Sequence, residues 1–106
     1  MRTVLALLAL LLLSTVVHAD PPFVRTNGMR HDWDQATCLA NVKGVMESLG
    51  FTDLEVDPDD VEGPKGEYMA EVLCWRRVVF AIVAGPVYDD AGDLRNSILE
   101  KLKALR

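Results

Sequence analysis

An unbroken apolar run, residues 4–13, lies near the start of the chain and decides how much sequence remains to build a domain. Arg2 precedes the run, and Val17 and Ala19 place small side chains at the −3 and −1 positions of a signal peptidase site before Asp20. This order of regions is typical of a secretory signal peptide. The apolar stretch, residues 3–17, is shorter than the roughly 20 residues that a membrane-spanning helix needs. We therefore expect residues 1–19 to be cleaved and the protein to be exported, to the periplasm or the medium, without stable membrane insertion.

Two cysteines remain after the expected cleavage, in 87 of the 106 residues. A domain of this size buries about 60–65% of its unfolded surface and is only modestly stable without a covalent link. An even pair in an exported chain predicts a disulfide between Cys38 and Cys74, worth about 3–4 kcal/mol. A redox-active pair would instead have two cysteines close together, as in Cys-X-X-Cys.

Acidic residues dominate the chain after residue 19. Ten basic residues then oppose sixteen acidic ones, a net charge of −6. Nucleic acids and anionic lipid surfaces attract cationic proteins, so this balance disfavours both as partners. It is compatible with a cationic partner, and it also serves solubility.

The first part of the mature chain has no sustained period. Residues 20–35 hold two prolines and Asn27-Gly28, which predicts an irregular arm with a turn, followed by one domain over residues 36–106. Apolar residues spaced by three and four predict a helix over residues 36–49. Asp34 or Thr37 can cap its start, and Gly50 stands where a left-handed residue ends a helix.

Alternating residues 54–56 predict a short strand, and residues 58–66 predict a loop because they hold two prolines and two glycines. Residues 67–75 and 78–84 predict two strands joined at Arg76-Arg77, although one long helix over this stretch is the alternative. A second helix is expected over residues 89–105, capped by Asp89 or Asp90. The order predicts an α+β fold: a helix, a three-stranded antiparallel sheet and a helix, with both helices on one sheet face and one disulfide.

Several short motifs occur in the same order as in a known group of proteins. They are Cys38-Leu39, Leu49-Gly50-Phe51, Gly66, Tyr68, Ala70, Cys74, Val78-Val79-Phe80 and Ala84-Gly85-Pro86. This layout resembles small exported bacterial domains of uncharacterised function. The resemblance implies the α-β-β-β-α order and a disulfide between helix and strand, and it implies no activity.

Strand alternation predicts an apolar sheet face that no helix covers. If Cys74 faces the helices, residues on the opposite face include Met69, Leu73, Trp75, Phe80 and Ile82. An exposed apolar patch usually marks an interaction site, so these residues are candidates for contact with a protein partner or a second copy. Alternatively, the arm folds over them with Phe23 and Trp33 as plugs. A one-residue slip at Arg76-Arg77 would change the faces of the last strand.

Six carboxylates lie within residues 53–62, and Asp57, Asp59, Asp60 and Glu62 are candidate ligands for Ca²⁺, which prefers clustered oxygens. The spacing does not match an EF-hand loop, because Glu62 stands at the sixth position from Asp57 in place of glycine. The carboxylates can equally form a solvated surface or contact a cationic partner.

No catalytic residues are expected. His31, beside Asp32 and Asp34, is the one histidine after residue 19, and its surroundings predict a solvated loop. Ser48 and Ser97 lie on predicted helices outside any nucleophile motif. We expect a binding or interaction protein without a cofactor, such as an envelope accessory factor or an inhibitor of a secreted enzyme. It would act through the apolar sheet face or the acidic loop. A calcium-binding or small-ligand-binding module is the alternative.

Overall fold

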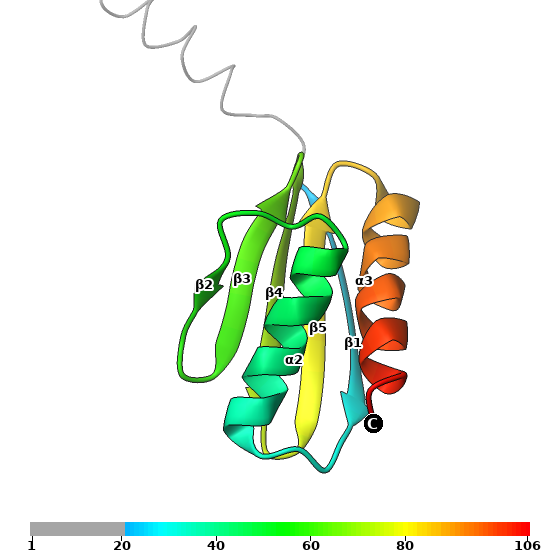
Figure 1. Cartoon of the computed structure of the whole chain (residues 1–106). Helices are drawn as coiled ribbons and strands as arrows, with labels where there is room; N and C mark the ends of the chain where they lie inside the picture. Colours follow the sequence, from blue (N-terminus) through cyan, green and yellow to red (C-terminus); the bar gives the residue numbers. More distant parts are fainter. Residues whose placement is uncertain (1–20) are drawn as a thin grey trace, which may run out of the picture.

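The computed structural model describes residues 21–106, so the expected signal peptide lies outside the described residues. Five strands form one antiparallel sheet in the order β1-β5-β4-β3-β2. Both helices lie on the same side of this sheet (Figure 1). The elements are β1 Phe23–Arg30, α2 Gln35–Ser48, β2 Glu55–Val56, β3 Asp60–Lys65, β4 Tyr68–Trp75, β5 Val78–Gly85 and α3 Tyr88–Lys103. Within residues 21–106, no helix is both long and apolar enough to cross a membrane.

The prediction of a three-stranded sheet is wrong, because two further strands form in segments that were expected to be irregular. The first is β1, which pairs with β5 along its whole length, from Phe23 opposite Gly85 to Arg30 opposite Val78. Asn27-Gly28, interpreted as a turn, lies inside this strand. The strand forms because β5 offers a free edge, and backbone pairing there outweighs the weak local preference of glycine and asparagine.

The second unexpected strand is β3, which occupies most of the predicted loop and contains Gly63 and Pro64. β2 pairs only with Val61 and Glu62, so the missing N–H of Pro64 falls beyond the part of β3 that pairs with a strand on that side. The Pro64 carbonyl accepts a hydrogen bond from the Thr52 N–H at 2.9 Å. A Cβ at Gly63 would lie 2.8 Å from the Thr52 carbonyl oxygen, so this close approach requires glycine.

The first helix follows its sequence signals. The Asp34 carboxylate accepts a hydrogen bond from the Thr37 N–H at 2.7 Å at the start of α2, and this bond lowers the pKa of Asp34. Gly50 has φ +91°, and the Phe51 N–H donates to the Met46 carbonyl, as expected for a glycine-terminated helix. The capping of α3 differs from the expectation: Val87 precedes it without a side-chain hydrogen bond.

The core lies between the two helices and one sheet face. The disulfide expected from the cysteine pair joins Cys38 of α2 to Cys74 of β4, with the two Cα atoms 6.2 Å apart. Ala70 and Ala81 are fully buried beneath the helices. The largest fully buried side chains are those of Met46, Ile98, Leu102, Val42, Val61, Val72, Val79 and Val83.

Candidate functional site

The β4–β5 hairpin decides which side chains reach the sheet face away from the helices. Its turn is Arg76-Arg77, and both residues have positive φ, 50° and 64°. A two-residue turn of this kind matches the right-handed twist of the strands. It sets Leu73 opposite Phe80 and Trp75 opposite Val78. The sequence left this register open, and the structure has the two-residue turn without a one-residue slip. The long-helix alternative over residues 67–84 is wrong.

We call the sheet face away from the helices the outer face. The five expected interface residues lie together on it, because Met69, Leu73 and Trp75 alternate with the buried side chains of β4, and Phe80 and Ile82 alternate with those of β5. Sequence reasoning missed the β1 contribution, since β1 was not expected to be a strand. From the register, the outer face also carries Val24, Thr26, Gly28, Arg30, Asp60, Glu62, Pro64, Glu71, Val78 and Ala84, so Glu71 lies between Met69 and Leu73.

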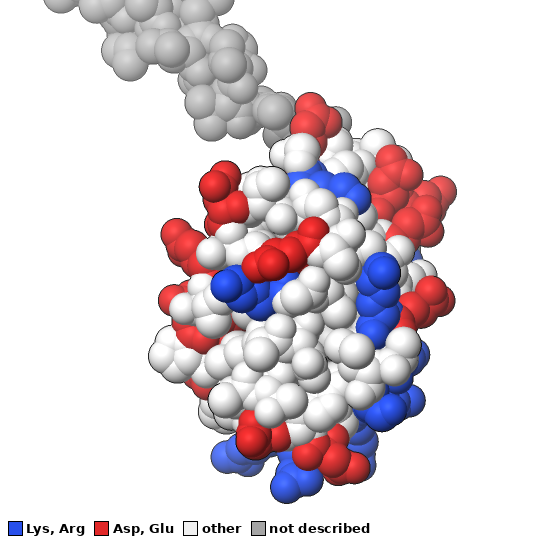
Figure 2. Space-filling view, viewed as in Figure 1, with Lys and Arg blue, Asp and Glu red and all other residues white. Residues whose placement is uncertain are grey.

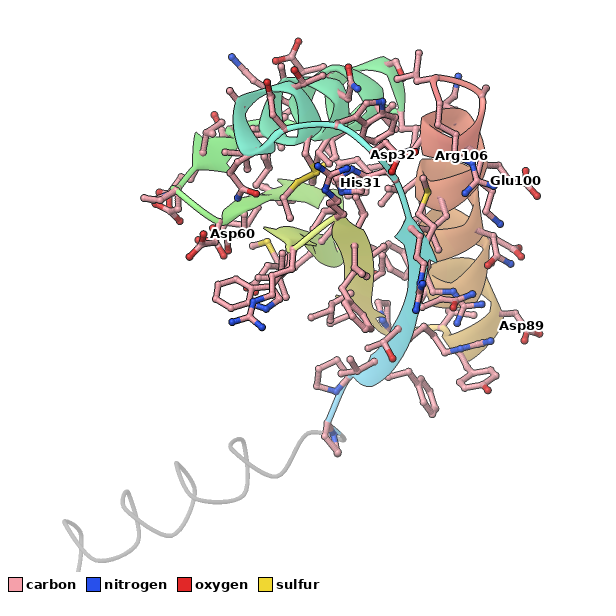
Figure 3. The ribbon with its side chains drawn as sticks, turned by 90° about the horizontal axis from the view of Figure 1, so that it is seen from below. His31, Asp32, Asp60, Asp89, Glu100 and Arg106 are labelled. Atoms are coloured by element: carbon pink, nitrogen blue, oxygen red, sulfur yellow. A yellow bond between two sulfur atoms is a disulfide. The ribbon has the colours of Figure 1, made fainter. Side chains whose placement is uncertain are left out.

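Large apolar side chains on the outer face remain accessible. Trp75 is 55% exposed, Met69 50% and Phe80 47%, whereas Val72 and Cys74 on the helix side are fully buried. The alternative in which the arm covers this face is wrong for residues 21–34. Phe23 packs edge-on against Tyr88 at the start of α3, and Trp33 packs against the core. In Figure 3, α2 lies above the sheet and α3 lies to its right, beside β1, and no described helix covers the opposite side of the sheet.

The β1 edge of the sheet is less open to a partner than the outer face. Side chains from the C-terminal part of the chain donate to its outward carbonyls: Arg95 Nη1 to Thr26 at 3.3 Å and Arg106 Nη1 to Arg30 at 3.0 Å. Sheet edges with unpaired backbone groups are templates for strand addition, and capping side chains blunt them. A partner is therefore expected on the face of the sheet and not along the β1 edge.

Carboxylates line the opposite, β2–β3 side of the sheet. Two groups place carboxylate oxygens within 4.8 Å of one another: Glu55, Asp57 and Glu62, and Asp60, Glu62 and Glu71. Figure 2 shows acidic side chains along this edge. Of the four expected calcium ligands, Asp57, Asp60 and Glu62 fall in these groups, and Asp59 falls in neither. Calcium binding stays a prediction, because exposed carboxylate groups occur without an ion.

The clustering of these carboxylates changes their titration. Burial and then the neighbouring Asp57 carboxyl group raise the pKa of Asp60. Burial, followed by the charges of Asp60 and Glu55, raises the pKa of Glu62. Burial is the first cause of both shifts and neighbouring carboxyl groups add to it, so a positive group brought to this edge would be stabilised.

The expectation for His31 is wrong: it does not lie in a solvated loop. Its side chain is 7% exposed and stacks on Trp33, with ring centroids 4.8 Å apart. Burial lowers its pKa, the Asp32 charge opposes this, and the Arg77 charge adds to it. Neither Asp32 nor Asp34 forms a hydrogen bond with the ring.

Comparison with known proteins supports the fold and gives no information on function. No protein-family model and no curated protein matches the chain. Among solved structures, the chain is similar to the NMR structure of PA4090 from Pseudomonas aeruginosa, with a TM-score of 0.62 and 20% identity over 78% of this chain and 83% of that one. At this identity the likeness shows a shared fold, and it supports a weak resemblance to a small bacterial protein.

Proposed function

We propose that this protein is a non-catalytic interaction protein that pairs with a second copy of itself through the outer face. The observation that carries the proposal is the set of large apolar side chains, including Trp75, Met69 and Phe80, about half exposed on one flat surface. Soluble proteins rarely leave a contiguous apolar patch of this kind uncovered, and such patches mark interaction sites.

The charge pattern of the outer face selects the occupant and its orientation. Arg30 lies at the β1 side and Asp60 and Glu62 lie on β3 near the other side, while Glu71 lies on the central strand β4. A two-fold axis parallel to the strands places the β1 side of one copy over the β3 side of the other, so Arg30 approaches the partner's acidic edge. A two-fold axis across the strands would place acid on acid, which costs free energy.

The same orientation also matches the apolar side chains. β5 of one copy lies over β4 of the other, which brings Phe80 toward the second copy's Leu73 and the reverse. A contact that uses the same patch on both copies is self-complementary, as a closed two-fold dimer requires. Sheets packed in this way lie about 10 Å apart, with side chains interdigitating between them.

The place of action belongs to the proposal too. A disulfide is typical of proteins that fold in an oxidising compartment, and the apolar N-terminal segment is typical of an export signal. We infer that the dimer forms after export, in the periplasm or outside the cell. Other protein partners, such as a secreted enzyme, would have to compete with the second copy for the outer face.

The test is the solution mass of the oxidised protein, produced by export of the full chain, measured by light scattering over a concentration series. We expect the mass to double as concentration rises. Leu73→Glu places a charge at the centre of the patch and is expected to leave a monomer at every concentration. Val87→Glu is the matched control, because Val87 is 46% exposed and lies off the outer face at the start of α3.

A charge exchange tests the orientation. Arg30→Glu and Asp60→Arg are each expected to weaken the dimer about tenfold, and the two changes in one chain are expected to restore it, since attraction returns with its sign reversed. A monomeric wild-type protein at all concentrations would overturn the pairing. A dimer that Leu73→Glu leaves intact would place the contact elsewhere on the molecule.

A further inference from the structure

A hollow at one end of the sheet gathers positive charge, although the chain as a whole is acidic. It has a volume of 770 Å³ and lies between the linker after β1, the β4–β5 turn and the C-terminal end of the chain. Four arginines line it: Arg30, Arg76, Arg77 and Arg106. Pockets for small ligands span about 300–1,000 Å³, so the size fits one such molecule.

One backbone hydrogen bond and one side-chain hydrogen bond join the three segments around the hollow. The His31 N–H donates to the Arg77 carbonyl at 2.9 Å, and Arg106 Nη1 donates to the Arg30 carbonyl at 3.0 Å. In Figure 3, His31, Asp32 and Arg106 lie near one another, while Asp60 lies at the opposite edge of the sheet. The arginines are thus brought together by the fold and kept apart from the acidic edge.

Little negative charge within the hollow balances these arginines. Asp32 is the one acidic side chain among the lining residues, and its carboxylate lies 3.4 Å from Arg77 Nη1. The Asp32 and Arg77 side chains are 99% and 69% exposed. Exposed pairs of this kind contribute little, so a bound anion can readily take the place of Asp32.

The turn carries arginines where the backbone favours other residues. Arg76 and Arg77 have φ of 50° and 64°, in the left-handed region that asparagine and glycine adopt at least cost. The turn would therefore form more easily without these two side chains. The guanidinium group of Arg76 lies over the Trp75 ring, 5.4 Å from its centroid, and that of Arg77 pairs with Asp32, and both residues line the hollow.

A buried donor beneath the arginines is a second, independent sign of a ligand. His31 Nδ1 accepts a hydrogen bond from the Trp33 N–H at 3.1 Å, so in the neutral ring Nε2 carries the proton. Nε2 is buried and has no partner among the described residues. Buried polar atoms almost always have one, and His31 lines the hollow. Because Nε2 itself is not accessible, an anion seated there would provide the missing acceptor only when the His31 ring turns toward it.

We propose that this arginine hollow binds a small multivalent oxyanion, with phosphate or carboxylate groups as the recognised chemistry. A guanidinium presents a planar fork of donors that matches the two oxygens of either group. The proposal does not depend on pairing of the outer faces, and its test variants leave Arg30 unchanged. Because Arg76 lies over the Trp75 ring of the outer face, the solution mass of the variants is measured alongside their affinity.

The test is a titration of the oxidised protein at constant ionic strength, followed by amide and histidine side-chain NMR signals. Pyrophosphate is the phosphate probe and citrate the carboxylate probe. We expect saturable shifts confined to residues 30–33, 76–78 and 105–106, with a change at His31 Nε2. Whichever probe binds more tightly identifies the preferred group.

Two double variants distinguish binding in the hollow from a general effect of the protein's net charge. Arg76→Asn/Arg77→Gly suits the turn geometry, so it is expected to fold at least as well and to lower the affinity at least tenfold. Lys43→Gln/Lys103→Gln removes the same number of charges from exposed helix positions and is expected to bind as wild type. The proposal is overturned if shifts do not saturate, if His31 Nε2 does not respond, or if both double variants lose affinity equally.

Discussion

The same strands form both faces of the sheet, but the side chains on the two faces differ in how far they are exposed. On β4, Val72 and Cys74 are fully buried against the helices, while their neighbours Leu73 and Trp75 lie on the outer face, with Trp75 55% exposed. Both faces carry large apolar side chains, although charged residues such as Glu71 and Arg30 also lie on the outer face, so the presence of apolar residues alone does not distinguish core from surface here. The distinction comes from small and β-branched side chains beneath the helices and large, accessible ones on the other side.

This contrast indicates that the inner face stabilises the fold and that the outer face is the one expected to bind a partner. Burial beneath the helices removes apolar area from water within one chain, so it contributes to folding. The apolar side chains of the outer face gain the same benefit only when something covers them. Changes to the inner face should therefore lower the free energy of unfolding, and changes to the outer face should alter association instead.

The largest expected effect comes from removing the covalent link on the inner side. Cys38→Ala/Cys74→Ala is expected to lower the free energy of unfolding by about 3–4 kcal/mol, because the disulfide limits the freedom of the unfolded chain. Urea unfolding of the variant measures the loss, and wild-type protein reduced by a thiol is the control. A loss below about 1 kcal/mol would mean that packing alone holds α2 against β4.

The next largest effect is a difference in the free energy of unfolding between variants of two adjacent residues of β4. Val72→Ala should cost about 2 kcal/mol, from lost burial and a residual cavity, while Leu73→Ala should cost less than about 1 kcal/mol in the monomer. Urea unfolding at a protein concentration low enough to prevent association measures both. An equal or larger loss for Leu73→Ala would contradict the contrast, since it would require an outer face that is covered within the chain.

The smallest effect is a dependence on pH that arises on the inner side. Burial lowers the pKa of His31 below its ordinary value of 6.5, so below that pH the unfolded chain binds more protons than the folded one. Stability should therefore fall as the pH drops from about 6.5 through the lowered pKa. His31→Gln should remove this part of the slope, measured by unfolding at pH 7 and pH 5.5.

The acidic edge acts in the opposite direction and must be separated from this effect. The raised pKa values of Asp60 and Glu62 mean that protonation relieves their repulsion as the pH falls. The comparison of wild type with His31→Gln cancels this contribution, because both proteins keep the acidic edge. Identical pH profiles for the two proteins would show that His31 does not titrate differently on folding.

Local signals in the sequence were sufficient for the elements whose formation is encoded locally. The spacing of apolar residues and the Asp34 and Gly50 caps predicted α2. Alternation on both sides of Arg76-Arg77 predicted the hairpin and assigned Met69, Leu73, Trp75, Phe80 and Ile82 to one face. The cysteine pair predicted the disulfide.

Only the tertiary structure decided the rest, because it depended on partners distant in sequence. β1 and β3 contain glycine, asparagine or proline, which disfavour strands locally, and they form because β5 and β4 offer edges to pair with. His31 becomes buried when the linker closes against the hairpin. The arginine hollow joins residues from three segments, so net charge could not reveal it. A composition sums over the whole chain, whereas a binding site depends on which charges the fold brings together.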